Sequence, residues 1–183
     1  MEEKQVRLMH YDPRWRQEFQ QTKSSILQSC DGWVTAVEHV GSTAISGLIA
    51  RPTIDVLAAV ENEAALTTAA QLIEGLNFRI NDSLAWSTQT IVLEKPRHLS
   101  SAQPDPTHCV WLVIYGSDCW LRMIRMRDWL REQKETAIRF EEAKVARWRS
   151  GEGALSAYES DKALFFAHLE DQMQASRRSE DSH

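Results

Sequence analysis

The sequence predicts a mixed α/β (α+β) fold, with a sheet flanked by helices and a helical C-terminal part. Three observations predict it. Apolar side chains recur at helical spacing near the N-terminus, residues 54–60 alternate as in a strand, and a long helical pattern follows Gly116. The 183 residues can bury one substantial core, so residues 1–174 are expected to form a single domain and the polar residues 175–183 a flexible tail.

The first helix is predicted from its cap and its apolar stripe. Asp12-Pro13 has the form of an N-cap followed by a proline in the first turn, and the helix continues to about Ser29. Its inward-facing positions share helical spacing: Trp15, Phe19, Thr22 and Ile26. Residues 33–40 are then expected to form a strand that leads into the turn Gly41-Ser42.

Residues 54–60 form the next strand, after a turn or short helix at residues 43–48. Side chains alternate along a strand, so the aliphatic side chains at positions 54, 56, 58 and 60 are expected on one face. Asp55 and Leu57 then lie on the other face. Asp55 is therefore opposite the more aliphatic face.

Three helices and three strands are expected in the rest of the chain. Asn62 supplies a helix cap, Gly116-Ser117 begins a long helix, and Ser156–Glu159 has the form of a capping box. A loop over residues 96–106 is indicated by its prolines. In order, the elements are a helix over 62–75, strands over 78–80, 86–94 and 108–115, one continuous helix over 116–150 and a final helix over 156–173.

Composition limits the classes of function. The 21 Lys and Arg against 26 Asp and Glu give a mildly acidic chain, so nucleic-acid binding through net charge is not expected. The three cysteines lack the paired spacing of a zinc site and are expected to be free thiols used in packing. The N-terminus lacks a signal peptide and no apolar run approaches about 20 residues, so a cytoplasmic location without a membrane partner is expected.

The strongest functional pattern is Val37-Glu-His-Val-Gly-Ser-Thr43 followed by Asp55 in an apolar strand. Backbone donors of the Gly41-Ser42 turn are suited to meet phosphate, while the aspartate is suited to hold a metal ion. The alternative is structural, because Gly-Ser is common in turns and Asp55 can be a hydrogen-bonded strand residue.

Several ionisable residues are further candidates. His39 and His108 are candidate bases or metal ligands, or they hydrogen-bond loop carbonyls. Glu94 can supply a second carboxylate or lie at a solvated strand end. Arg51 can hold a phosphate or form a surface salt bridge. The arginines between positions 122 and 131 are expected to form a solvated helix face, in which Arg127 can pair with Asp128.

A family resemblance joins these residues. The chain resembles the GrpB family in successive motifs: Tyr11-Asp-Pro-Arg-Trp15, Glu38-His-Val-Gly-Ser-Thr43, Arg51-Pro-Thr-Ile-Asp-Val56, Thr107-His108, Gly116-Ser117, Trp120, Arg127-Asp-Trp-Leu-Arg131, and Tyr158 with Lys162. The similarity covers about residues 7–169. It implies a nucleotidyltransferase-like mixed sheet, with Gly41-Ser42 facing nucleotide phosphates.

The resemblance also implies how the site is assembled. It brings the strand with His108 into the sheet that carries His39, so both histidines are expected beside Ser42 and Asp55 in one concave site. Arg51 and Lys162 are then expected at its rim. For Tyr158 and Lys162 two arrangements stay open: both point into the site, or both lie along a packed helix with the lysine reaching solvent.

Two departures weaken the inference of catalysis. Active nucleotidyltransferases usually carry two carboxylates two residues apart on one strand, and the second position here is Leu57. GrpB-like sequences generally show the same single acid. Family members also often have a second histidine where this chain has Trp111.

The resulting prediction is a Mg²⁺-dependent nucleotidyl- or phosphoryl-transfer enzyme that acts on a nucleoside triphosphate and an unknown acceptor. Asp55, His39 and His108 are its candidate catalytic residues, with Mg²⁺ or another divalent metal on Asp55 and His108. Two alternatives remain open. One is a noncatalytic module that binds a nucleotide or another phosphate-containing ligand, and the other is an interaction scaffold.

Overall fold

The computed structural model describes residues 7–84, 89–101, 105–150, 170–171 and 174. Within this part, strands and helices are mixed along the chain, and the last two elements are helices. The elements are α1 (Arg14–Ser29), β1 (Val34–Val40), the 3-10 turn η1 (Ser42–Ala44), β2 (Ile54–Val60), α2 (Glu63–Glu74), β3 (Arg79–Ile80), the 3-10 turn η2 (Asp82–Leu84), β4 (Thr90–Lys95), β5 (His108–Ile114), α3 (Asp118–Glu132) and α4 (Lys134–Ser150).

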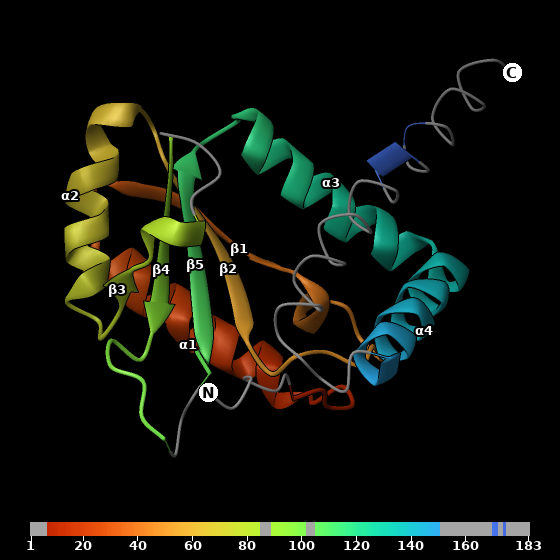
Figure 1. Cartoon of the computed structure of the whole chain (residues 1–183). Helices are drawn as coiled ribbons and strands as arrows, with labels where there is room; N and C mark the ends of the chain where they lie inside the picture. Colours follow the sequence, from red (N-terminus) through yellow and green to blue (C-terminus); the bar gives the residue numbers. More distant parts are fainter. Residues whose placement is uncertain (1–6, 85–88, 102–104, 151–169, 172–173, 175–183) are drawn as a thin grey trace, which may run out of the picture.

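The strands form one mixed sheet with the order β1-β2-β5-β4-β3. The central pair β2 and β5 is parallel, and the other three pairs are antiparallel. Figure 1 shows the sheet in the middle of the molecule, with α1 crossing behind it and α3 leaving from the end of β5 towards α4. The predicted mixed α+β fold, with a sheet flanked by helices, is confirmed.

One face of the sheet packs against α1 and α2. Alternate residues of β2 enter this core, as the strand pattern predicts: Ile54, Val56, Ala58 and Val60. The four predicted inward positions of α1 are also buried, and Asn62 caps α2 by accepting a hydrogen bond from Ala65 N at 3.3 Å. The expected strand at residues 86–94 is observed as Thr90–Lys95, with residues 85–88 outside the described part.

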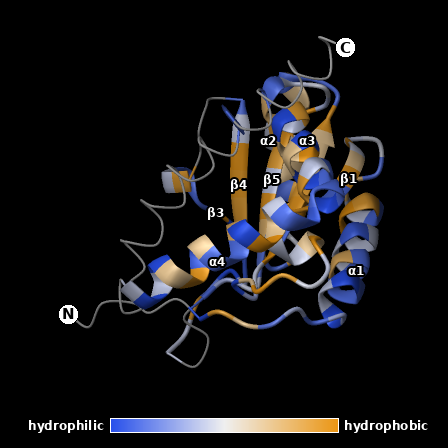
Figure 2. Cartoon of the chain, turned by 90° about the vertical axis from the view of Figure 1, so that its right-hand side faces the viewer, coloured by the Kyte–Doolittle hydropathy of each residue, from blue (hydrophilic) through white to orange (hydrophobic). Residues whose placement is uncertain are grey.

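The opposite face packs against α3. Its core contains the other set of β2 side chains with their neighbours: Val40, Leu57, Ala59, Val113 and Trp120. Figure 2 shows the apolar strands β4 and β5 in orange and polar residues in blue along the helices. None of the three cysteines is in a disulfide, as predicted, and burial raises the pKa of the Cys30 thiol to about 11.

The predicted continuous helix over 116–150 is wrong, because the chain turns at Gln133 between α3 and α4. In one straight helix, Met126 and Phe140 would lie about 21 Å apart along the axis. Instead, both contribute to one cluster with the loop residues Ile45 and Leu48. Burial against this loop therefore explains a break that no Gly or Pro marks in the sequence.

The predicted final helix over 156–173 falls almost entirely outside the described residues, as do Tyr158, Lys162 and the expected tail at 175–183. Residues 170–171 and 174 are helical. In the part of the chain that the structure describes, no helix is both long and apolar enough to cross a membrane.

Candidate functional site

The turn after β1 lies directly on Asp55. Val40 pairs with Asp55 across the antiparallel strands β1 and β2, and Gly41 follows with φ +72°. A Cβ on Gly41 would lie 2.4 Å from Asp55 Oδ2. Only glycine fits there without a shift, because both the positive φ and the close carboxylate disfavour a side chain. The predicted proximity of the Gly-Ser turn and Asp55 is therefore confirmed.

A lysine from α4 reaches the same turn. Lys144 is 9% exposed, and its Nζ donates to Ser42 Oγ at 3.4 Å and to the carbonyl of Ile49. Sequence reasoning named Arg51 and Lys162 as the cations at the rim of the site, and Lys162 lies outside the described residues. It did not name Lys144. The missed signal was the helical spacing of Lys144 with Ala137 and Phe140, which are buried on the same side of α4.

Trp111 occupies one side of the Asp55 carboxylate. In the parallel pair β2 and β5, Trp111 lies opposite Leu57, and its Nε1 donates to Asp55 Oδ1 over 3.4 Å. An indole N–H is a donor only, so it favours the ionised carboxylate but cannot bind a metal ion. The side chain at this position thus stabilises Asp55 without adding a ligand.

The predicted convergence of both histidines and Asp55 on one site is wrong. His39 pairs with Val56, and His108 pairs with Ile54. Directly paired residues point to the same face, so both histidines lie on the face covered by α1 and α2, whereas Asp55 lies on the face covered by α3. The offset of one residue along β2 places the two kinds of group on opposite sides of the sheet.

His39 is a buried, neutral residue. Its ring stacks on Phe19 with centroids 4.6 Å apart, and its Nε2 lies 3.0 Å from Thr43 Oγ1. Thr43 Oγ1 donates its single hydrogen to the carbonyl of Thr53, so His39 Nε2 carries the proton and donates to Thr43. Burial lowers the pKa of His39 to about 4, and the charges of Arg131 and Arg127 add to the effect.

His108 has a related arrangement with the opposite tautomer. Its Nδ1 lies 2.9 Å from Thr107 Oγ1, and Thr107 Oγ1 donates to the carbonyl of Lys95 at 3.2 Å. His108 Nδ1 therefore donates to Thr107, and Nε2 keeps its lone pair. Burial lowers the pKa of His108 to about 4, with a further contribution from the Lys95 charge. In the described part of the chain, neither histidine makes the direct bond to a backbone carbonyl that one alternative expected. Each donates instead to a threonine hydroxyl, which in turn donates to a carbonyl.

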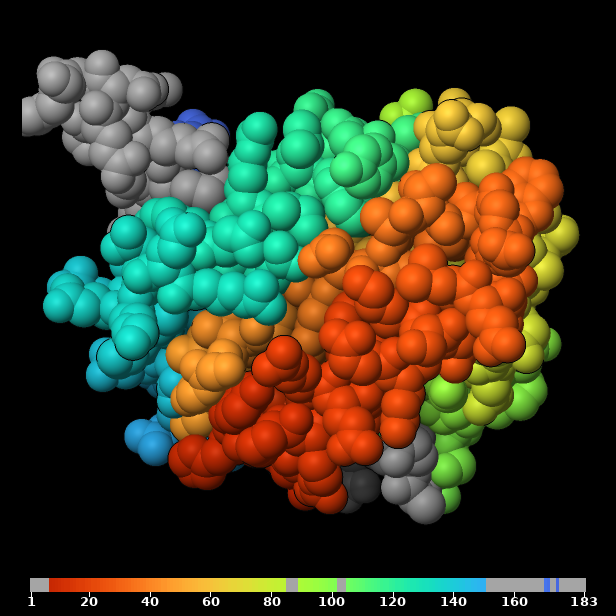
Figure 3. All heavy atoms as spheres, turned by 180° about the vertical axis from the view of Figure 1, so that it is seen from behind, coloured from red at the N-terminus to blue at the C-terminus, as the bar shows by residue number. Residues whose placement is uncertain are grey.

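His39 lines a groove of about 830 Å³ between α1, the loop after η1, and the α3–α4 pair. Figure 3 shows this side of the molecule, with the orange loop between red α1 and the teal and blue helices. Arg127 lies in the groove wall and donates to Glu38 Oε2 at 2.7 Å and to Asp128 Oδ1 at 2.8 Å. The predicted pair of Arg127 with Asp128 is confirmed. Glu38 and His39 face opposite sides of β1.

Arg51 and Glu94 have structural partners. Arg51 Nη2 donates to Asp105 Oδ1 at 3.0 Å, as in the salt-bridge alternative. Glu94 is 8% exposed and accepts hydrogen bonds from Asn81 at 2.9 Å and Arg79 at 3.3 Å, so the expectation of a solvated strand end is wrong. Burial of the carboxylate is balanced by these two donors.

Glu94 and Asp55 share a face of the sheet but are two strands apart. Both pair with Cys109 of β5, one from β4 and one from β2. Two strand spacings amount to about 10 Å, too far for both carboxylates to hold one ion. Among the described residues, no group of three or more His, Cys, Asp or Glu side chains is placed to hold a metal ion.

A magnesium ion would need no protein ligand at this turn other than Asp55. Mg²⁺ usually keeps several waters and takes one or two carboxylates together with phosphate oxygens. A softer metal held by two imidazoles and Asp55 does not fit, because His39 and His108 are on the other face of the sheet. The residues present are thus compatible with one hard cation that a phosphate ligand helps to hold.

The fold and this turn define a class of protein, a mixed α+β domain in which a Gly-Ser turn packs on a single strand aspartate. The chain belongs to the GrpB family, since the family model described as GrpB protein matches residues 5–172. A crystal structure of the conserved protein GrpB from Enterococcus faecalis has the same fold. Its TM-score is 0.79 at 22% identity, with 93% of this chain and 99% of that chain covered.

Curated relatives agree with the family assignment. The chain is 32% identical over 129 residues to a UPF0157 protein of Halalkalibacterium halodurans, covering 69% of this chain and 60% of that protein. It is 30% identical over 135 residues to a UPF0157 protein of Deinococcus radiodurans, covering 72% and 64%. Each match thus spans less than two thirds of the relative. Glutamate-rich protein GrpB of Alkalihalophilus pseudofirmus is 24% identical over 155 residues, covering 76% of this chain and 79% of that protein.

Proposed function

We propose that this protein binds a nucleoside triphosphate with Mg²⁺ at the Gly41-Ser42 turn and Asp55, and that it acts as a binding module. The observation that carries the proposal is the close approach of the Gly41 backbone to Asp55 Oδ2, where a Cβ would lie at 2.4 Å. The turn presents backbone beside a carboxylate. This arrangement is suited to a phosphate group and the cation that accompanies it.

The charges at the turn support a phosphate ligand. Lys144 brings an ammonium group to Ser42, and an ammonium close to a phosphate offsets its charge. Asp55 would hold the Mg²⁺ that accompanies the triphosphate, and the ion would neutralise part of the phosphate charge. Asp55 and Lys144 then have different roles, because only Asp55 makes binding depend on the metal.

Two side chains favour binding over group transfer. Leu57 is fully buried at the position where a second carboxylate would share the metal, and Trp111 supplies a donor beside Asp55. Glu94 is about 10 Å from Asp55 along the sheet, whereas paired catalytic metals are about 4 Å apart. The described residues therefore support one cation at this turn better than a two-metal centre.

Titration calorimetry with ATP tests the proposal, with Mg²⁺ and with EDTA. Asp55→Asn keeps the shape of the side chain and should weaken binding about tenfold or more in Mg²⁺ only. Lys144→Gln should weaken binding in both conditions, while Lys134→Gln, an exposed lysine on the same helix, should not. Thermal melting establishes that each variant is folded.

Two results would contradict this function. Equal ATP affinity of the wild-type and Asp55→Asn proteins in both conditions would remove Asp55 from the site. Release of pyrophosphate, or of phosphate with ADP, in proportion to a modified acceptor would show transfer and replace the binding module with an enzyme.

A further inference from the structure

We propose that a second pocket, between α1 and the ends of β4 and β5, binds a small carboxylate that carries a hydrogen-bond donor on the neighbouring carbon, as 2-amino and 2-hydroxy acids do. This pocket contains His108 and lies on the face of the sheet opposite Asp55. The inference does not rest on nucleotide binding, because the two places share no residue.

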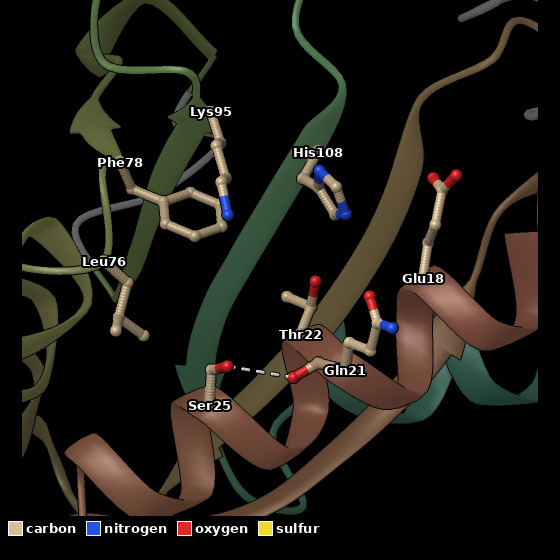
Figure 4. A pocket seen from close by; sticks show the side chains of 8 residues that line it. All are labelled: Glu18, Gln21, Thr22, Ser25, Leu76, Phe78, Lys95 and His108. Atoms are coloured by element: carbon tan, nitrogen blue, oxygen red, sulfur yellow. Dashed lines mark hydrogen bonds between the residues drawn. The ribbon is translucent and has the colours of Figure 1, made fainter.

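The size of the pocket limits its ligand. Its volume is about 260 Å³, below the roughly 300–1,000 Å³ of sites for drug-sized molecules, so it suits a molecule smaller than a nucleotide. Leu76 and Phe78 form an apolar side, while Gln21, Thr22 and Ser25 of α1 lie on the opposite side. Figure 4 shows Lys95 and His108 extending from neighbouring strands into the space between these two sides.

Lys95 supplies the group that recognises a carboxylate. Its Nζ lies 5.5 Å from the centroid of the Phe78 ring. The quadrupole of the ring face attracts the ammonium group. Unlike a carboxylate, the ring does not accept conventional hydrogen bonds from the N–H donors of Lys95. Those donors are then suited to meet an anion in the pocket, where the apolar ring keeps the charge partly away from water.

His108 supplies an acceptor next to that cation. Lys95 and His108 are direct cross-strand partners, so their Cβ atoms are about 5 Å apart on one face. Since Thr107 Oγ1 donates to the Lys95 carbonyl, it accepts from His108 Nδ1 and leaves Nε2 without a proton. A neutral imidazole nitrogen accepts an O–H or N–H, which a simple carboxylate lacks.

The two groups together define the ligand class. One small molecule satisfies both groups if it carries a carboxylate for Lys95 and a hydrogen-bond donor for His108. In a 2-amino or 2-hydroxy acid, the donor atom is two bonds from the carboxylate carbon. Leu76 and Phe78 can pack against an aliphatic side chain. Glu18 at the pocket adds a carboxylate that would favour an ammonium donor over a hydroxyl.

Four probes of nearly equal size test this chemistry by calorimetry: L-leucine, its 2-hydroxy analogue, 4-methylpentanoate and L-leucinamide. The 2-amino acid, the 2-hydroxy acid or both should bind saturably, and 4-methylpentanoate and the amide should bind at least tenfold more weakly. Binding of the amino acid alone identifies an ammonium donor, and binding of the hydroxy acid alone identifies a hydroxyl. Equal binding of 4-methylpentanoate, or no saturable binding of any probe, would overturn the proposal.

Variants separate the two recognition groups. Lys95→Met should abolish binding of all acids, whereas Lys23→Met should leave it unchanged, because Lys23 lies 6.0 Å from the Phe19 ring centroid and outside this pocket. His108→Leu should remove the preference for the acid with a donor over 4-methylpentanoate. A preference that survives in folded His108→Leu protein contradicts the role of His108.

A measurement on the wild-type protein locates the bound ligand even if a variant fails to fold. Nuclear Overhauser effects should connect the ligand side chain to the Phe78 ring, and contacts with other aromatic rings alone would refute the location. A saturating concentration of the 2-amino or 2-hydroxy acid should leave the affinity for ATP unchanged. If the protein binds the amino or hydroxy acid but not ATP, only the proposed nucleotide function fails. If it binds ATP but neither acid, only the proposal for this pocket fails.

Discussion

The two faces of the sheet use their polar side chains in different ways. On the face covered by α1 and α2, His39 is buried and His108 is partly buried, and each is neutral and hydrogen-bonded to a threonine. On the face covered by α3, Asp55 lies against the Gly41 turn and accepts a hydrogen bond from Trp111. Alternation along β2 separates the faces, so residues adjacent in a motif belong to different environments.

This difference teaches that a motif does not define a single site. His39 and Gly41 are two residues apart in the sequence, yet the imidazole lies under α1 and the glycine packs on the carboxylate of the other face. Burial sets the properties of the histidines on the face under α1 and α2, whereas the charge of Asp55 sets those of the face under α3. Changes of pH and of side-chain volume should therefore affect the two faces differently.

Acid should destabilise the histidine face most strongly. Each folded-state pKa is lowered from 6.5 to about 4, so the unfolded state binds protons more readily below pH 6.5. The free energy of unfolding is then fully retained above pH 6.5 and falls towards pH 4. Each histidine contributes up to about 1.4 kcal/mol per pH unit in that window. Urea unfolding between pH 4.5 and 7.5 measures the slope.

The matched variants for this experiment are His39→Gln and His98→Gln. Glutamine can still donate to Thr43 but does not titrate, so His39→Gln should flatten the pH dependence. His98 is exposed, and its replacement should leave the slope unchanged. Identical slopes for wild-type and His39→Gln protein would show that burial of His39 does not contribute to the acid sensitivity of this face.

On the aspartate face, Gly41→Ala should have the next largest effect. A residue other than glycine with φ +72° and ψ −175° costs about 1–3 kcal/mol, and the overlap with Asp55 adds a packing cost of about 1–3 kcal/mol. Gly47→Ala is the control, since Gly47 has φ +87° but a Cβ there would meet no atom within 4 Å. Thermal and urea unfolding should give a loss of about 3 kcal/mol for Gly41→Ala and about 1 kcal/mol for Gly47→Ala.

The cause of that loss can be tested in an Asp55→Ala background. Removing the carboxylate eliminates the nearest atom to the added methyl group, so part of the Gly41→Ala cost should disappear. Equal losses at Gly41 and Gly47, or no recovery in the Asp55→Ala protein, would mean that backbone strain alone explains the glycine.

Local chemistry made much of this fold predictable. The inward stripe of α1, the Asn62 cap and the two faces of β2 follow from spacing and side-chain type. The break at Gln133 does not, because it depends on burial of α3 and α4 residues against a loop far away in the sequence. Helix propensity favours continuation there, and tertiary packing overrides it.

The site was predictable in part for the same reason. Gly41 and Asp55 come together through a local connection between antiparallel neighbours. The parallel register of β2 and β5 then decides whether Asp55 meets His108 or Trp111, and no pattern within either strand specifies that register. Lys144 was missed because its partner Ser42 is 102 residues away.

The smallest expected effect comes from placing an imidazole on the aspartate face. Trp111→His would put a metal-binding nitrogen beside Asp55, in place of the indole N–H that now donates to Oδ1. Binding of Co²⁺ without nucleotide should become about tenfold tighter than in Trp111→Phe, a difference of about 1.4 kcal/mol. Calorimetry measures the affinity, and the Co²⁺ absorption spectrum reports nitrogen ligation. Adding Asp55→Asn to Trp111→His should cancel the gain, because a single imidazole then remains. Equal Co²⁺ affinity of the histidine and phenylalanine variants would show that a side chain at position 111 does not reach a metal at Asp55. A single substitution on the aspartate face would then be too little to create a cation site with an imidazole ligand.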